Sequence, residues 1–401
     1  MPEAADQLSP ASWRRLAIVG GALAVAKGLR LPLLWAATQA QVDYSEGVVK
    51  RGLLGTINRA LHLSLEHYIS FYAFSYMVFV VLAALVLRRL GRVGLSGTSG
   101  GAAVVALFAA SFGLTYLVNL IGYLDIILLL LAVVVLEIRH PLGQPAAALV
   151  LGVVACFFHE IYAIAFFPVT LLPVALRYAK GERAWAPLAL AGAAVAAVLA
   201  TAIFLAAAQP LDADAVARLQ GGVLRRVDFP IRSDFFPVFL RSGTENLRET
   251  IALMGQSAWW IDQACAALAF LPTTACFVWV ALRIAKSIYP GPAGRLARLA
   301  ILVASASPLL MNVLGWDIYR WYAYTVIEAF LALTVVAEAS GGSSFALRGR
   351  EVVAVLVLIS LNLATSVGLI SEDQAPTFPY KSEVQEVVDH GIRGLIHAPD
   401  L

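Results

Sequence analysis

Apolar runs of membrane-spanning length recur along this chain and restrict its fold more than any other feature. A helix that crosses a bilayer needs about 20 mostly apolar residues, because every backbone polar group must be satisfied within the segment. Of the 401 residues, 60% are hydrophobic and 14% are charged, and a soluble domain could not bury so much apolar surface. We therefore expect an all-α, polytopic transmembrane protein with about eleven spans, near residues 16–38, 68–87, 102–118, 121–137, 145–158, 161–176, 186–207, 262–284, 297–315, 319–338 and 351–370.

Basic clusters in short connections indicate the orientation, because Lys and Arg are enriched in cytoplasmic loops. They fall at every second connection, so we expect a cytoplasmic tail (1–15), a transmembrane domain (16–370) and a non-cytoplasmic C-terminal tail (371–401). The outer connections then include loops 39–66 and 209–260. The bias toward Ala, Leu, Val and Gly favours a prokaryotic inner membrane. The clusters are Arg88, Arg89 and Arg92; Arg139 and His140; Arg177, Lys180 and Arg183; Arg283, Lys286, Arg295 and Arg298; and Arg348 and Arg350.

Net charge and cysteine content exclude several kinds of protein. The net charge of +3 is small and the basic residues form no continuous face, which argues against a nucleic-acid partner. The three cysteines lie in apolar segments without metal-ligand spacing, so neither a disulfide framework nor a zinc site is indicated. Lys27 and Arg30 interrupt the first apolar run, which favours a retained helix over a cleaved signal peptide. Both cations could snorkel to the interface or line a polar cavity.

The first outer loop carries an acidic and basic pattern ahead of an amphipathic segment. Asp43, Glu46 and Lys50 would share one face of a helix, and Arg51 follows them. The segment after Gly47 predicts a helix lying in the membrane interface. A simpler interpretation is an interfacial anchor stabilised by a Glu46–Lys50 ion pair.

Three further groups of polar residues fall on the same predicted side. Asn119 and Asp125 lie at one outer turn, His159 and Glu160 at the next, and Asp317 and Arg320 at an aromatic corner. His159 and Glu160 are not expected to pair, because adjacent residues point in different directions on a helix. Asp317 and Arg320 fit an i, i+3 ion pair, and the aromatic residues fit an interfacial belt.

The long outer loop is predicted to contain two short helices, one over residues 212–226 and one starting near Thr244 with Glu245 in its first turn. It also carries Arg225, Arg226 and Arg232, and basic residues on the outer side predict a bound anion. Charge is costly in lipid, so polar groups from several segments at one membrane face predict a shared site.

This layout resembles the GT-C superfamily of membrane glycosyltransferases, in its many-helix body and in its acidic first outer loop followed by an amphipathic helix. The resemblance implies a polyprenyl-phosphate or polyprenyl-diphosphate sugar as donor and Asp43 as the acidic residue that acts on the acceptor. The adjacent acidic pair frequent in that superfamily is absent, because Tyr44 and Ser45 separate Asp43 from Glu46. This departure leaves two points open, namely which residue is the base and whether a divalent metal takes part. No other cofactor is implied.

Sugar transfer from a lipid phosphate needs a carboxylate to accept the hydroxyl proton and cations to stabilise the departing phosphate. The expected partners are a lipid-linked sugar, a glycan or lipid acceptor, and membrane lipids. Asp43 is the candidate base, with Glu46 positioning the acceptor. The candidate substrate-binding residues are Lys50, Arg51 and Arg320 at the phosphate, His159 and Glu160 at the sugar or leaving group, Arg225, Arg226 and Arg232 over the site, and Asn119, Asp125 and Asp317 beside it.

Other functions fit the same pattern. A polysaccharide polymerase acting on lipid-linked repeat units would also have a cation-rich outer site. A transporter or lipid flippase would use Lys27, Arg30 and Asp125 as mid-membrane groups. A non-catalytic membrane scaffold would leave the outer polar residues unexplained.

Overall fold

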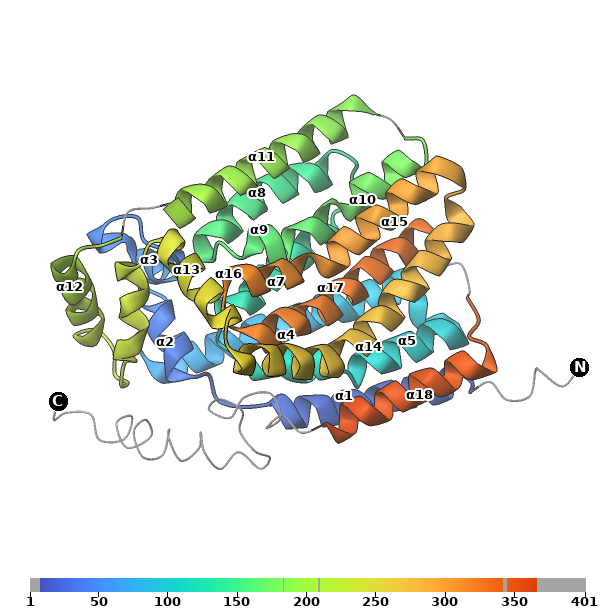
Figure 1. The fold of residues 1–401 in the computed structure, drawn as a ribbon, viewed down its shortest axis with the longest axis horizontal. Helices are drawn as coiled ribbons and strands as arrows, with labels where there is room; N and C mark the ends of the chain where they lie inside the picture. Colours follow the sequence, from blue (N-terminus) through green and yellow to red (C-terminus); the bar gives the residue numbers. More distant parts are fainter. Residues whose placement is uncertain (1–7, 183, 208–209, 342–344, 366–401) are drawn as a thin grey trace, which may run out of the picture.

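The computed structural model describes residues 8–182, 184–207, 210–341 and 345–365, and all regular structure in these ranges is helical. An elongated bundle of roughly parallel and antiparallel helices forms the body (Figure 1). Its helices are α1 (Pro10–Gly28), α4 (Tyr68–Val93), α5 (Ser99–Ala109), α6 (Phe112–Asn119), α7 (Leu124–Glu137), α8 (Gly143–Phe158), α9 (Tyr162–Ala165), α10 (Phe167–Ala179), α11 (Trp185–Ala207), α14 (Ser257–Ile288), α15 (Gly291–Ala306), α17 (Ile318–Ala339) and α18 (Gly349–Ala364).

Short helices gather at one end of this body, which lies on the left in Figure 1. They come from the first loop, the long loop and the segment before α17. They are α2 (Leu34–Ala40), η1 (Tyr44–Glu46), α3 (Leu53–Leu61), α12 (Ala213–Leu224), η3 (Ser233–Leu240), α13 (Gly243–Met254) and α16 (Met311–Leu314). Two further 3-10 turns are η2 (Leu95–Gly97), which connects α4 and α5, and η4 (Ser307–Leu310), which connects α15 and α16.

The prediction of an all-helical chain with membrane-length apolar helices is confirmed for the described residues. Six segments are long and apolar enough to cross a membrane, and α5 with α6, bent by 42°, would make a seventh. Each predicted apolar run overlaps helical structure in the described residues, but some runs are divided between two helices and some helices are shorter, so the count of eleven stays a prediction. The six segments are Tyr68–Val93, Tyr162–Ala179, Trp185–Ala207, Ser257–Ile288, Gly291–Leu314 and Ile318–Ala339.

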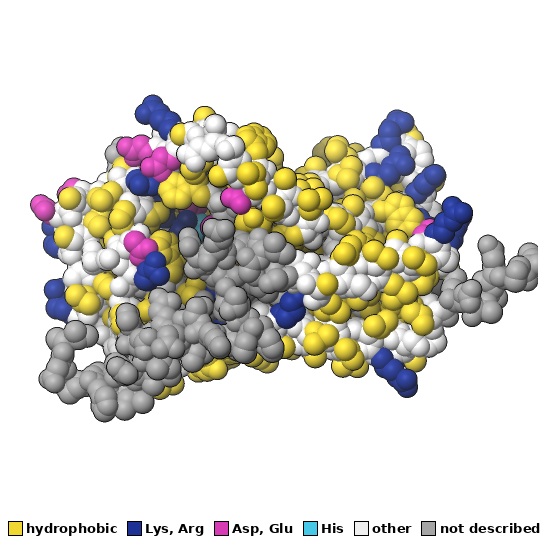
Figure 2. All heavy atoms as spheres, turned by 60° about the horizontal axis from the view of Figure 1, so that its bottom comes forward, with side chains coloured by type: hydrophobic (Ala, Val, Ile, Leu, Met, Phe, Trp, Pro, Cys, Tyr) yellow, Lys and Arg dark blue, Asp and Glu magenta, His cyan; other side chains and the backbone are white. Residues whose placement is uncertain are grey.

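The outer surface of the body is apolar, as expected of helices that face lipid. In α4 and α11 large hydrophobic side chains such as Leu87, Trp185 and Ile203 are exposed. Figure 2 shows Lys, Arg, Asp and Glu mainly at the two ends of the visible face, with hydrophobic side chains between them. An apolar surface of this extent is compatible with a membrane environment. In contrast, α17 is buried along almost its whole length against α6, α10, α14 and α15.

The first predicted span is divided into α1 and α2. Gly28 ends α1 where it meets α6 so closely that a Cβ atom would lie 2.2 Å from the Thr115 carbonyl oxygen. The structure places the Lys27 side chain against the end of α18. Its ammonium donates to three carbonyl oxygens at the end of α18, at 3.3, 2.9 and 2.6 Å, which belong to Asn362, Leu363 and Thr365. Lys27 therefore satisfies carbonyls that have no partner within α18.

Replacing Lys27 with Met should lower the free energy of unfolding by about 1 to 3 kcal/mol, because these charge-assisted hydrogen bonds are lost. Thermal unfolding in detergent measures the effect, with Arg14→Met as the control, since Arg14 is exposed on the same helix. Equal unfolding midpoints for the two variants would show that the contact with α18 contributes nothing.

The third predicted span is also broken, between α5 and α6. The Ser111 side chain accepts from the Leu114 N–H and begins a new helix. The Asn362 side chain reaches the same break from α18, where its Oδ1 accepts from the Phe112 N–H at 2.8 Å. A buried amide between helices thus replaces the bonds that a continuous helix would make.

The end of the bundle opposite the short helices carries a basic network. Arg92 pairs with Glu137 at 2.6 Å, and Arg89 pairs with Glu137 and Glu338 at 3.5 and 3.1 Å. Arg139 also contacts Glu338, at 3.1 Å. Two of the five basic groups that the sequence assigns to the cytoplasmic side, at the end of α4 and after α7, therefore meet at acidic residues of α7 and α17. The C-terminal tail (371–401) and the end of the last predicted span lie outside the described residues.

Candidate functional site

The first loop and the long loop pack against each other through a small hydrophobic core of their own. This core comprises Val42, Val49, Val216, Leu219, Val223, Phe235, Phe236 and Phe239. The two helices predicted in the long loop are confirmed: Asp212 caps α12, and Ser242 with Glu245 forms a capping box at α13. The turns of η3 were not predicted, and they supply the buried phenylalanines.

Asp43 connects the two loops through a group that we name the Asp43 clamp, made of Asp43, Arg59 and Arg226. Its carboxylate is only 2% exposed. One oxygen, Oδ2, accepts from Arg59 Nη1 at 2.9 Å and from Arg226 Nη1 at 2.7 Å, while Oδ1 accepts from the Ser45 N–H at 2.9 Å. Arg226 also donates to the Gln41 carbonyl oxygen. Asp43 therefore holds α12 of the long loop against the first loop.

The clamp determines the ionisation of Asp43. Burial alone would raise the pKa of this carboxyl, but hydrogen bonds from Ser45, Arg226 and Arg59 outweigh burial and lower the pKa to about 2. Asp43 is thus ionised throughout the physiological range. It is a strong hydrogen-bond acceptor, and its basicity is low for a group that removes a proton.

The depressed pKa predicts acid sensitivity. The stabilisation from Asp43 is fully present above the unfolded pKa of 3.8 and is lost as the pH falls toward the folded pKa of about 2. The shift corresponds to about 2 kcal/mol. Thermal unfolding of the wild-type chain and of Asp43→Asn should differ by this amount near pH 6 and converge near pH 2. A difference that does not change between these two pH values would contradict the assignment.

The structure corrects two expectations for the first loop. The amphipathic helix α3 begins at Leu53, not directly after Gly47, because a turn at positive φ (Gly47 and Arg51) intervenes. Asp43, Glu46 and Lys50 therefore do not share a helix face. The expected Glu46–Lys50 ion pair is not the main contact of Glu46. The Glu46 carboxylate instead accepts a hydrogen bond from Arg218 of α12 at 2.9 Å.

A buried ion pair links the start of α7 to the start of α17. Arg320 contacts Asp125 at 2.5 Å, although the two residues are 195 positions apart, and it also contacts Asp317 at 2.6 Å. The predicted i, i+3 pair is confirmed, but its partner Asp125 could not be inferred from spacing. Asp125 is 1% exposed and Arg320 is 9% exposed. Arg320 is therefore fully engaged by two carboxylates.

The turn between α8 and α9 extends this group. The expectation that His159 and Glu160 do not pair is wrong: Nδ1 and Oε2 lie 3.2 Å apart, because His159 is extended and the two residues occupy a turn instead of a helix. Glu160 also lies 3.8 Å from Arg51. Burial opposes ionisation of Glu160, but His159 and Arg51 lower its pKa; burial and Arg51 together lower the pKa of His159.

We name these charged residues together the end cluster. One half surrounds the Asp125–Arg320 pair and the other half surrounds His159 and Glu160. The electrostatic interaction between His159 and Asp125 joins the two halves. The end cluster gathers charged side chains from the first loop, α7, the α8–α9 turn and α17. Its members are Lys50, Arg51, Asp125, His159, Glu160, Asp317 and Arg320.

Lys50 is the member of the end cluster that lines a surface pocket. Its side chain is 9% exposed, and burial lowers the pKa of its ammonium, while Glu160 raises it. Arg241 lines the same pocket, where it pairs with Glu249 and lies over the Trp316 ring at 5.7 Å. The pocket is otherwise mainly apolar, with Val48, Val49, Pro210, Leu211, Val238 and Phe239 in its walls.

Four predicted site residues are not brought into these groups, and the first is Glu46, which accepts from Arg218. Arg225 is exposed at the end of α12, and Arg232 pairs locally with Asp234 at 2.7 Å. Asn119 is buried at the end of α6, and its side-chain amide nitrogen donates no hydrogen bond in the described structure. Of the three long-loop arginines proposed to cover the site, Arg226 pairs with the buried Asp43 carboxylate.

Sequence analysis missed four residues that the site contains. Arg59, Arg218 and Arg241 are partners of acidic residues, and Tyr324 lies within hydrogen-bonding distance of Arg320, with 3.3 Å between Arg320 Nε and the Tyr324 oxygen. Tyr324 follows Arg320 by one helical turn, and this spacing could have identified it. The three arginines gave no such signal, because their partners lie far along the chain or in another helix.

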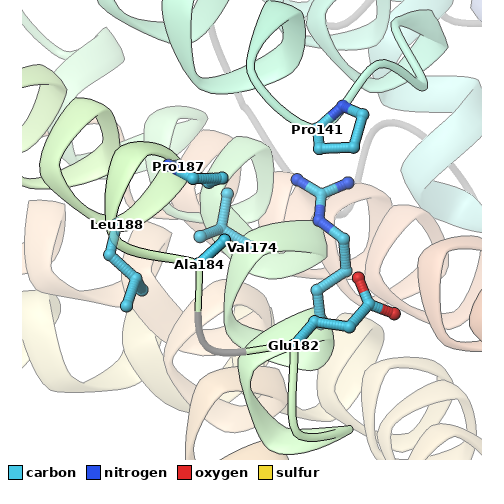
Figure 3. Close-up of a pocket in the computed structure, with 7 residues that line it drawn as sticks. Pro141, Val174, Glu182, Ala184, Pro187 and Leu188 are labelled. Atoms are coloured by element: carbon cyan, nitrogen blue, oxygen red, sulfur yellow. The ribbon is translucent and has the colours of Figure 1, made fainter.

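A second pocket lies at the opposite end of the bundle (Figure 3). It is formed by the start of α8, the end of α10 and the start of α11, with lining residues Pro141, Val174, Arg177, Glu182, Ala184, Pro187 and Leu188. Among the described residues, no group of three His, Cys, Asp or Glu side chains is arranged to hold a metal. Cys156, Cys265 and Cys276 are free thiols.

No family model matches the chain, and neither a curated protein nor a solved structure is significantly similar to it. The functional argument therefore depends on the geometry of the site.

Proposed function

We propose that this chain is a membrane glycosyltransferase with a GT-C-like body of about eleven spans, which transfers a sugar from a polyprenyl-(di)phosphate carrier to an acceptor. The observation that carries the proposal is the burial of charged residues from separate segments at one end of an apolar bundle. Charge is costly at membrane depth, so such a gathering is retained where a polar substrate binds. In this proposal the end cluster faces the periplasm of a prokaryotic inner membrane.

The pocket beside Lys50 supports a lipid phosphate as the ligand. Lys50 and Arg241 supply two cations within walls formed mainly by apolar side chains such as Leu211 and Phe239. A phosphate between the cations and a prenyl chain along the apolar walls would satisfy both surfaces. Arg51 lies next to this position and is held by Glu160. Arg320 is assigned a positioning role, because Asp125 and Asp317 already occupy its guanidinium.

The Asp43 clamp supports a role for Asp43 in binding the acceptor hydroxyl. An ionised carboxylate that bridges the two loops can accept a hydrogen bond from an acceptor hydroxyl once Arg59 or Arg226 moves aside. The hydroxyl oxygen then attacks the anomeric carbon, the bond from that carbon to the carrier phosphate breaks, and the hydroxyl proton passes to the carboxylate. The cations stabilise the phosphate that leaves.

The transport alternative receives no support from Lys27 and Asp125, two of the three residues expected to serve it. Lys27 caps α18, and Asp125 is paired with Arg320 at the start of α17. A polymerase acting on lipid-linked repeat units remains the alternative within enzymes, since it would use the same cations.

Incubation of the purified chain in vesicles with lipid-linked sugars extracted from the producing cells tests the function. We expect the sugar to leave its carrier and to appear in a single covalent addition. A ladder of products would favour the polymerase, and movement of the intact substrate across the vesicle membrane would contradict both enzymes.

A further inference from the structure

Helix α17 carries a line of polar side chains from the end cluster into the middle of the bundle. Arg320, Tyr324 and Glu328 are spaced four residues apart and lie on one face, about 6 Å apart along the helix axis. Glu328 lies at the midpoint of α17, ten residues after Ile318 and eleven before Ala339. A carboxyl group at this depth has no role in the proposed sugar transfer.

The Glu328 carboxyl is fully enclosed. Its relative exposure is 0%, and neither oxygen has a hydrogen-bond partner in the described structure. An ionised carboxylate in such a place would lack both water and a counter-ion, at a cost that proteins avoid by protonating the group. Glu328 is therefore a neutral carboxylic acid in this conformation.

Tyr162 of α9 provides a second, independent feature at the same place. Its side chain is also 0% exposed, and its hydroxyl has no hydrogen-bond partner in the described structure. Tyr162 is electrostatically linked to Glu328 and to Cys156. No charged side chain of the described α6, α10, α14 or α15 pairs with the Glu328 carboxyl.

Tyr324 connects this position with the end cluster. It lies one turn before Glu328 on α17, and its hydroxyl forms hydrogen bonds with the Asp125–Arg320 pair. The Phe166 ring packs on the Tyr324 ring with centroids 4.9 Å apart, and the Tyr162 ring lies 6.4 Å from the same Phe166 ring. The two tyrosines thus flank the route from the core to the end cluster.

We propose that Glu328 and Tyr162 form an internal proton-binding site, which exchanges its proton with the end cluster through Tyr324. The Glu328 proton passes to the Tyr324 oxygen as the Tyr324 proton passes to the Asp125 carboxylate; a side-chain rotation at Glu328 or Tyr324 closes the gap between them. The ligand is a proton, and the site does not depend on which substrate the end cluster binds. Its consequence is that the charge of the end cluster changes with the protonation of the core.

Infrared spectroscopy of the purified full chain in lipid vesicles tests the binding site. At pH 7 we expect a carbonyl band of a protonated carboxylic acid, absent in Glu328→Gln and retained in the control Glu182→Gln, since Glu182 is exposed. Absence of this band from the wild-type spectrum would overturn the proposal without reference to any variant. Its persistence in folded Glu328→Gln would also overturn it.

Exchange into heavy water tests the route. The Glu328 band should shift on deuteration, and Tyr324→Phe should slow the shift on the order of 100-fold, as expected when a positioned proton-transfer group is removed. Tyr322→Phe is the matched control, because this tyrosine lies on the same helix but bonds Gln263. Equal exchange rates in the two tyrosine variants would overturn the route through Tyr324.

Discussion

Arg320→Met should be the most destabilising single substitution at the site, with a loss of about 3 to 5 kcal/mol in the free energy of unfolding. The substitution leaves the Asp125 carboxylate, which is 1% exposed, without its counter-ion. Methionine keeps most of the side-chain length, so the lost interaction is mainly the charge. Thermal unfolding in detergent measures the effect. Sugar transfer should be lost as well, because the starts of α7 and α17 no longer hold the end cluster together.

A double-mutant cycle separates the ion pair from simple loss of packing. Adding Asp125→Asn to Arg320→Met removes the unpaired charge, so the double variant should be at least about 1 kcal/mol more stable than the sum of the single effects implies. Arg232→Met is the surface control, because Arg232 is 45% exposed and pairs with a neighbouring residue. Equal destabilisation by Arg320→Met and Arg232→Met would contradict the role of the buried pair.

Asp43→Asn should lower the rate of sugar transfer on the order of 100-fold or more, because an amide cannot take up the acceptor proton. The variant keeps the size of the side chain but loses the charge that binds Arg59 and Arg226. Turnover of extracted lipid-linked sugar is the measurement, normalised to folded protein. Asp234→Asn is the matched control, since Asp234 is exposed and pairs only locally with Arg232.

Arg59→Gln distinguishes a base from a clamp. It removes one ion pair of the Asp43 clamp but keeps the carboxylate, so turnover should fall far less than in Asp43→Asn. An equal fall in both variants would assign Asp43 a positioning role, and unchanged turnover in folded Asp43→Asn would remove it from the reaction.

The helical body could be predicted from apolar run length, since spanning helices must satisfy their own backbone. The breaks at Gly28 and Ser111 could not, because they depend on contacts with α6 and α18. In the site, Asp317 and Arg320 follow from helical spacing, whereas the pair between Arg320 and Asp125 requires knowledge of which helices are neighbours.

The expectation for His159 and Glu160 failed because it assumed a helix where the chain makes a turn. Glu328 was overlooked for a different reason: it lies within a long apolar run, where a single carboxylate hardly changes the mean hydropathy. A search for isolated ionisable residues inside each run would have found it.

Binding of polyprenyl phosphate, without sugar, tests the central claim that this end of the bundle holds a lipid phosphate. The purified chain should be stabilised by the lipid, and Lys50→Gln combined with Arg241→Gln should weaken binding about 10- to 100-fold, as expected when charge-assisted contacts are lost. Arg225→Gln, at an exposed arginine outside the pocket, should bind like the wild type. Equal affinity of the double variant and the wild type, or no binding by the wild type, would contradict the account.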